Sequence, residues 1–162
     1  RATEKAIQLE PNNYVVLGIV GQMLAYGGTC SENDIKERVS GACYWEKGWE
    51  YSLKASKLDK ANIDVIKNYT LGWFYILWDE HQLAMDQIMQ APSPGFYWWD
   101  IFAGVAADGL GNVAEAQKRF DSVKAAFGST ELITVKPVFS LYNLENTLWP
   151  TVERVLVKYG WQ

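Results

Sequence analysis

The chain has 162 residues, of which 49% are hydrophobic and 14% aromatic, and its formal net charge is -4 at pH 7. This amount of buriable surface excludes a disordered chain, and an acidic balance without a Lys/Arg cluster argues against nucleic-acid binding. The composition is typical of one globular domain or of a short array of repeats.

The first eleven residues are predicted to be the end of a helix. The segments "KAIQLEPN" (5–12) and "KASKLDKAN" (54–62) share a basic, apolar-striped helix end followed by a break. Because no Met precedes this helix end, we expect the chain to be a fragment of a longer protein. The apolar segment 14–26 is shorter than the ~20 residues that span a bilayer, so no membrane contact is required of it.

Helical periodicity continues along the chain, whereas alternation with a period of two does not extend beyond a few residues, so the sequence predicts an all-α fold. Pro92, Pro94 and Gly95 separate two helix pairs, and Pro150 suits the first turn of the last helix. The predicted helices span 12–27, 46–59, 63–79, 81–91, 95–109, 113–127, 137–145 and 149–160.

An insertion over residues 29–45 interrupts the first helix pair. "SEND" (31–34) predicts a short helix capped by Ser31. The sequence leaves open whether Cys30 and Cys43 are free or bridged. A bridge would be worth about 2–3 kcal/mol and would favour an extracytoplasmic (periplasmic) over a cytoplasmic location. The single histidine of the chain, His81, is distant in sequence, and two thiols alone rarely bind zinc, so we predict no metal.

An internal repeat organises the chain. Aligning "LGWFYILWDEHQLA" (71–84) with "AGVAADGLGNVAEA" (103–116) pairs three positions 32 residues apart: Gly72 with Gly104, Asp79 with Gly111, and Ala84 with Ala116. Gly21 and Gly28 show the same seven-residue step. Small residues in both helices let them approach closely, a turn residue reverses the chain, and the hairpins must stack to cover their apolar faces.

This repeat divides one domain, 1–162, into successive helix hairpins. After the truncated helix (1–11), the predicted units are hairpin 1 (12–60, with the insertion), hairpin 2 (61–92), hairpin 3 (93–128) and C-terminal capping helices (129–162).

These residues resemble the tetratricopeptide-repeat family, whose repeat has 34 residues. The register is met by Gly104, Gly111, Ala116 and Phe120 in hairpin 3, by Gly72, Tyr75 and Ala84 in hairpin 2, and by Leu17, Gly21, Leu24, Gly28 and Ala55 in hairpin 1. Departures are the missing early Trp, Gly48 in place of Ala, and Lys60 in place of the closing Pro. The chain also resembles the C-terminal repeat domain of bacterial signalling proteins that carry nucleotidyl cyclase or winged-helix domains.

The resemblance implies a right-handed α-solenoid whose first helices line a concave groove. It places the groove residues at fixed steps from each repeat glycine: Gly18, Gln22, Ala25 and Tyr26, then Tyr69, Trp73 and Ile76, then Trp98, Ile101, Val105 and Asp108. Trp99 is expected in the core, since adjacent helical residues point about 100° apart. The groove lacks the Lys, Asn and Arg of family members that bind a peptide carboxylate, so we expect it to bind an apolar or aromatic group.

Catalytic chemistry is not predicted. His81 lies at an expected helix–helix turn without an orienting partner and a cleft. Asp100 and Asp108 are two helical turns apart, about 12 Å, which is too far for a paired-carboxylate site. We therefore expect no enzyme activity and no cofactor.

Three functions remain open: a module that binds a protein, a peptide or another domain of its own chain, a sensor for a small apolar or aromatic ligand, and a self-association module. A cavity of about 300 Å³ or more, closed at both ends, would favour the small ligand, and an open trough a protein. In the leading case Trp73→Ala should weaken binding without unfolding the domain. Alternatively, "PVFSLYNL" (137–144) fills the groove and makes its aromatic residues structural.

Overall fold

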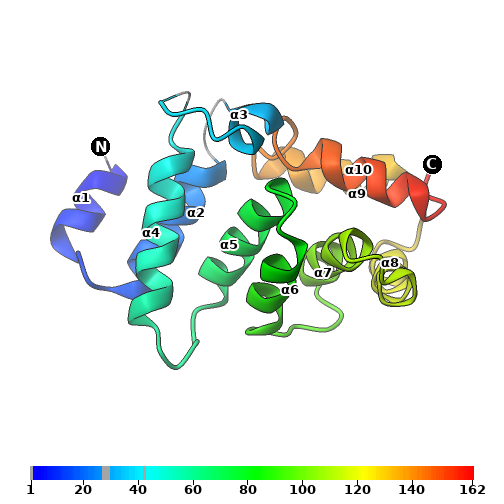
Figure 1. Cartoon of the computed structure of the whole chain (residues 1–162), viewed down its shortest axis with the longest axis horizontal. Coiled ribbons are helices and arrows are strands. Elements are labelled where there is room, and N and C mark those ends of the chain that lie inside the picture. The colour runs from blue at the N-terminus through cyan, green and yellow to red at the C-terminus, as the bar shows by residue number, and fades with distance from the viewer. Residues whose placement is uncertain (1, 27–29, 42) are drawn as a thin grey trace.

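The computed structural model describes residues 2–26, 30–41 and 43–162. Over these ranges it is built from ten helices without a strand (Figure 1), which confirms the predicted all-α class. The helices are α1 Ala2–Leu9, α2 Tyr14–Tyr26, α3 Glu32–Lys36, α4 Trp45–Leu58, α5 Val65–Leu77, α6 His81–Met89, α7 Tyr97–Gly109, α8 Val113–Phe127, α9 Leu132–Leu141 and α10 Trp149–Lys158. None of the described helices has the length and apolar character needed to cross a bilayer.

One predicted helix, 137–145, is wrong in position. The chain forms α9 over Leu132–Leu141, so Pro137 lies inside the helix rather than at its start. Val135 and Phe139, four residues apart, are fully buried, whereas Ile133 and Pro137 lie on the exposed side. Water can therefore replace the hydrogen bond that proline cannot donate to Ile133, while burial of the opposite face stabilises the helix.

Consecutive helices pair along the chain. α2 packs mainly on α4, α5 on α6 and α7 on α8, and Figure 1 shows the three pairs side by side. The α2–α4 pair has a glycine on each side of the contact: a Cβ added to Gly48 would lie 2.8 Å from the amide nitrogen of Ala25, and one on Gly21 would lie 3.0 Å from the carbonyl oxygen of Gly48. This confirms the predicted close approach at small residues.

In the other two pairs, a glycine of the first helix lies against a side chain of the second helix. A Cβ on Gly72 would lie 2.8 Å from Ile88, and a Cβ on Gly104 would lie 2.7 Å from the ring of Phe120. Both glycines are the repeat positions recognised in the sequence, 32 residues apart. They let the larger side chain of the second helix reach the backbone of the first.

The turn between paired helices also recurs at this interval. Left-handed residues occupy equivalent positions: Asp79 (φ 57°), Gly111 (φ 73°) and Asn143 (φ 57°). Each donates its amide to the carbonyl three residues earlier, at 3.1, 2.9 and 3.1 Å, and the next residue donates to the carbonyl five residues before it, at 2.9 Å in all three turns. The predicted turn position Gly28 lies outside the described residues.

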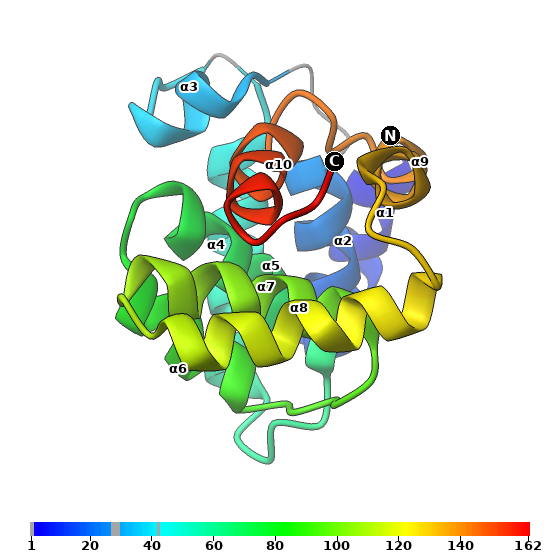
Figure 2. The same ribbon diagram turned by 90° about the vertical axis from the view of Figure 1, so that its right-hand side faces the viewer.

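The third of these turns belongs to a unit that the repeat alignment did not identify. Asn143 joins α9 to α10 with the backbone geometry of the two earlier turns, and asparagine tolerates the left-handed conformation better than most residues. However, Lys136 stands where Gly72 and Gly104 stand in the earlier units. α9 and α10 pack less extensively on each other than the three earlier pairs do, and α10 also packs on α7; Figure 2 shows α10 above α7 and α8.

The insertion connects distant parts of the chain. Cys30 and Cys43 form a disulfide, with their Cα atoms 5.7 Å apart, and Ser31 forms the predicted N-terminal cap of α3 through a reciprocal hydrogen bond with Asp34. The indole of Trp78, after α5, donates to the carbonyl of Ile35 at 2.8 Å. Glu32 accepts from the hydroxyl of Thr151 in α10 at 2.9 Å, so the insertion ties α5 to α10.

Candidate functional site

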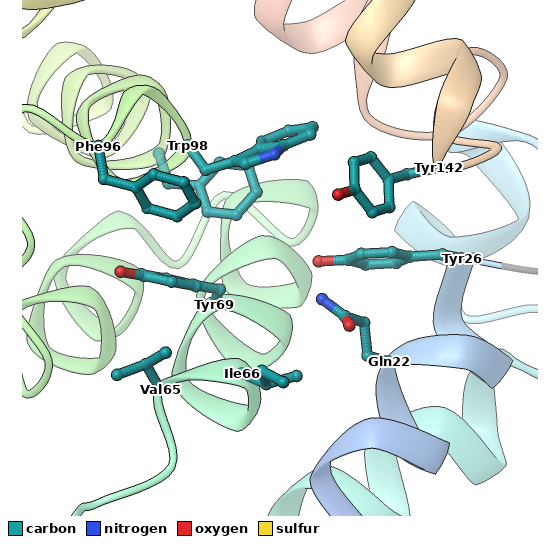
Figure 3. A pocket seen from close by; sticks show the side chains of 9 residues that line it. Gln22, Tyr26, Val65, Ile66, Tyr69, Phe96, Trp98 and Tyr142 are labelled. Atoms are coloured by element: carbon teal, nitrogen blue, oxygen red, sulfur yellow. The ribbon is translucent and has the colours of Figure 1, made fainter.

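A pocket of about 260 Å³ lies between α2, α5 and α7. Figure 3 shows the side chains that line it. Six of the nine described lining residues are aromatic. The nine are Gln22, Tyr26, Val65, Ile66, Tyr69, Phe96, Trp98, Phe102 and Tyr142. The pocket is therefore lined by the first helix of each of three pairs and is bordered by the segment that follows α9.

One wall carries polar ends. Gln22 and Tyr26 lie one turn apart on α2 and therefore share a face of that helix, and Tyr142 follows α9. Figure 3 shows the amide of Gln22 and the hydroxyls of Tyr26 and Tyr142 pointing into the space between α2 and α5. The α2 segment contains no charged residue, so this wall offers neutral hydrogen-bonding groups only.

The opposite wall is made of aromatic rings. Tyr69 comes from α5, Phe96 precedes α7, and Trp98 and Phe102 lie one turn apart on α7. The ring of Phe102 is 6.3 Å from Tyr69 and 5.6 Å from Trp98, centroid to centroid, and Trp98 meets the ring of Tyr142 edge-on at 5.6 Å. These contacts hold the rings in fixed orientations, since each is packed against the next.

Burial keeps the tyrosine hydroxyls neutral. Desolvation raises the pKa of Tyr26 to about 12, although interactions with Gln22 and Thr70 lower it in part and Tyr142 adds to the rise. Desolvation also raises the pKa of Tyr69, against an opposing interaction with Ser93. None of the described residues lining the pocket carries a charged side chain. The pocket is thus apolar and aromatic, with uncharged donors and acceptors on one side.

Four of the residues expected in the groove line this pocket: Gln22, Tyr26, Tyr69 and Trp98. They come from three hairpins, as the repeat spacing predicted. Whether they bind a partner stays a prediction. Trp99 lies in the core, 1% exposed, and its indole donates to the carbonyl of Ile88 at 3.1 Å, as expected from its position beside Trp98.

Four other expected groove residues do not face an accessible surface. The exposed fractions of Trp73, Ile76, Ile101 and Val105 are between 0 and 2%, and all four belong to the hydrophobic core. The C-terminal segment is part of the reason, because α10 covers α7 and Phe139 of "PVFSLYNL" packs 4.8 Å from the ring of Trp98. The expectation that Trp73→Ala would spare the fold is corrected accordingly.

Asp108, Gly18 and Ala25 also differ from the expectation. The carboxylate of Asp108 is engaged by the chain itself, accepting from Lys158 and from the hydroxyl of Tyr159 at 2.8 Å. Gly18 and Ala25 are buried. A Cβ added to Gly18 would collide with the carboxylate of Asp64, so Gly18 serves the contact between α2 and α5.

Sequence reasoning missed five lining residues: Val65, Ile66, Phe96, Phe102 and Tyr142. Helical spacing contained a signal for three of them. Val65 and Ile66 precede Tyr69 by four and three residues, and Phe102 follows Trp98 by four, so each shares a helix face with a predicted residue. Phe96 and Tyr142 lie outside helices, where periodicity gives no information.

The residues considered for catalysis do not converge. Asp100 is buried and accepts from the amide of Gly95 at 3.1 Å and from Arg119 at 3.5 Å. The ring of His81 lies against Gly109. The Nε2 atom of His81 is 3.7 Å from the carboxylate of Asp79. Among the described residues no group of three or more His, Cys, Asp and Glu could hold a metal ion.

Comparison of the chain with protein-family models, with curated proteins and with solved structures gives no match. The geometry and chemistry of the aromatic pocket are therefore the basis for assigning a function.

Proposed function

We propose that the chain is a non-catalytic interaction module that accepts one bulky apolar side chain of a protein or peptide partner in the aromatic pocket. The observation that carries this proposal is an aromatic, uncharged pocket whose mouth has an exposed apolar rim. Three of the lining residues are themselves partly exposed: Val65 (38%), Phe96 (43%) and Tyr142 (43%).

Exposed apolar residues also lie close in sequence to the lining residues on α2 and α9. Ile19 lies one turn before Gln22 on the same face of α2, and Met23 directly follows Gln22. Leu141 directly precedes Tyr142. All three are exposed, with fractions of 40, 55 and 77%. Exposed apolar side chains close to an apolar pocket favour a protein–protein contact site.

The size of the pocket favours a partner's side chain over a free ligand. A volume of about 260 Å³ is below the roughly 300–1,000 Å³ of ordinary small-molecule sites. A small ligand would also leave Ile19, Met23 and Leu141 in water, whereas a peptide or protein surface would cover them. A sensor for a small aromatic ligand and a self-association module are the alternatives that the experiment below separates.

We further propose that the helix pairs form a solenoid of the tetratricopeptide type. The turn that recurs at Asp79, Gly111 and Asn143 and the small-residue contacts at equal spacing support this relationship. The Cys30–Cys43 bond is compatible with a cytoplasmic or a periplasmic location, and oxidising compartments are where such bonds most often persist. A role within a bacterial signalling or transcriptional protein rests on the sequence resemblance.

The proposal is tested by selecting binders from a random peptide library and then blocking the pocket. Val65→Trp fills the pocket from the first residue of α5. Val113→Trp is the matched control, because Val113 is also the first residue of a helix, follows an N-cap (Asn112, as Asp64 precedes Val65), and is exposed. We expect selected peptides to share a bulky apolar anchor and to lose at least about tenfold in affinity with Val65→Trp only.

Equal binding by both variants would show that the pocket is not the site. A dimeric mass in solution that reverts to a monomer with Met23→Glu would instead support self-association, in which the rim is buried between two copies.

A further inference from the structure

We propose that the side chain accepted by the pocket is a tyrosine or a tryptophan, an aromatic ring that carries one neutral hydrogen-bonding group. This inference rests on the proposed function and specifies the chemistry of the partner. It follows from the division of the pocket into an aromatic wall and a polar wall (Figure 3).

The aromatic wall selects for a ring. Tyr69, Trp98 and Phe102 are 6, 9 and 1% exposed, so their orientations are fixed by the surrounding core. Their mutual contacts are tilted or edge-on, with interplanar angles of 71° for Tyr69–Phe102 and 52° for Trp98–Phe102. An inserted ring can extend this arrangement with its own edge-to-face contacts, which an aliphatic side chain cannot make.

The polar wall selects for a hydrogen-bonding group. The amide of Gln22 and the hydroxyl of Tyr142 point toward the hydroxyl of Tyr26 from two sides. Both residues remain partly exposed at the pocket. The Gln22 amide already interacts with the hydroxyl of Tyr26, but an amide has two donors and an acceptor. An anchor without a polar group would leave the remaining capacity unpaired, and sites of this kind discriminate against such analogues.

The charge of the lining argues against an anionic anchor. In the part of the chain that the structure describes, no Asp, Glu, Lys, Arg or His lines the pocket. Two buried carboxylates on these helices do not line the pocket: Asp100 is engaged by Arg119 and by the amide of Gly95, and Asp64 accepts from the amide of Ile66. A carboxylate entering the pocket would lose hydration without gaining a counter-charge. A phenol or an indole is neutral and supplies one O–H or N–H donor.

The experiment uses side-chain analogues as probes of the whole chain. Binding of 4-methylphenol, 3-methylindole, toluene, 4-methylbenzoate and tetramethylammonium is measured by NMR titration, which follows the side-chain amide of Gln22. We expect 4-methylphenol and 3-methylindole to bind at least about tenfold more tightly than toluene and to shift the Gln22 signal, while 4-methylbenzoate binds no better than toluene.

A variant identifies the origin of this preference. Gln22→Met keeps the length of the side chain and removes its amide, and we expect the preference for 4-methylphenol over toluene to fall to about threefold or less. Gln117→Met, on the exposed side of α8, is the control and should leave the preference unchanged. Circular dichroism melting of both variants establishes that the fold is intact.

The outcomes separate this inference from the proposed function. Equal binding of toluene and 4-methylphenol, tighter binding of tetramethylammonium than of either, or binding by no probe would each overturn the tyrosine or tryptophan assignment. The interaction module itself would still stand if Val65→Trp abolished peptide binding. If Val65→Trp had no effect on peptides while the phenol probes bound, the pocket would be a small-molecule site.

Discussion

Two regions that border α5 show opposite uses of hydrogen-bonding groups. At the junction of α4 and α5, the ammonium group of Lys67 is 1% exposed and donates to Asp59 at 2.8 Å, to Asn62 at 2.9 Å and to the carbonyl of Asp64 at 2.6 Å. An ammonium group has three donors, so the chain itself satisfies all of them.

The pocket on the other side of the same helix is neutral, and part of its polar surface remains accessible. Gln22 and Tyr142 direct their ends into a space that the chain does not fill. A buried group saturated by its own chain contributes to folding, whereas convergent groups left at an apolar opening are available to a partner. The two regions should therefore respond differently to mutation.

The largest effect is expected from Lys67→Met. Removing the ammonium group leaves the buried carboxylate of Asp59 without its partner, which we expect to cost about 3–5 kcal/mol of unfolding free energy. Urea denaturation measures the loss. The double variant Asp59→Asn with Lys67→Met should recover part of it, and Lys124→Met, at an exposed position of α8, should change stability by less than about 0.5 kcal/mol. A small effect of Lys67→Met would contradict the folding role of the junction.

Trp73→Ala tests the boundary between core and pocket on α5. The ring of Trp73 is fully buried and meets Tyr26 edge-on at 5.3 Å, so we expect a loss of about 3–5 kcal/mol. Val65→Ala, at the exposed edge of the pocket, should cost less than about 1 kcal/mol. Thermal and urea unfolding compare the two variants. A folded Trp73→Ala protein of near-native stability with impaired peptide binding would restore the original groove assignment.

Opening the disulfide should weaken the fold without changing what the pocket recognises. Cys30→Ser with Cys43→Ser removes a cross-link over a sequence separation of 13 residues, and we expect a stability loss of about 2–3 kcal/mol. The affinity for 4-methylphenol should stay within about twofold under conditions where the variant is folded. A thiol count in denaturant without reductant checks the bond itself, since two free thiols in the wild-type protein would refute it.

The smallest effect concerns acid pH. Burial by itself would raise the pKa of Asp59, but hydrogen bonds from Lys67 and from the amides of Asp64 and Ile63 outweigh it and lower the pKa. A lowered pKa in the folded state gives stability that is present above the ordinary value of 3.8 and is lost as the pH falls through the folded value. Asp64, whose pKa burial raises, acts in the opposite direction.

The contribution of Asp59 is isolated by comparison with Asp59→Asn. We expect the stability difference between wild type and this variant to be constant from pH 7 to about pH 5 and to shrink as the pH falls below about 4. Urea midpoints over this range measure it. A difference that grows on acidification would mean that the sign of the shift is wrong.

Much of the fold could be predicted from the sequence because small residues and turn residues repeat at a fixed interval. Gly72, Gly104 and Ala116 contain this information locally. The position of α9 could not be predicted in this way. Pro137 indicates a helix start, whereas burial of Phe139 stabilises a helix that begins before this proline. The same limit applies to the pocket: repeat spacing identified Tyr69 and Trp98, but the contribution of the chain after α9 depends on tertiary packing.

The recurring turn at Asn143 has a consequence for the affinity of the pocket. Tyr142 directly precedes Asn143. The amide of Tyr142 donates to the carbonyl of Phe139 at 3.2 Å, so the backbone that carries the ring of Tyr142 is fixed before any partner binds. A contact group on a free chain end would lose conformational entropy on binding, whereas one held by a rigid bend loses little. The turn that also follows α5 and α7 thus gives the pocket a preorganised edge where it follows α9.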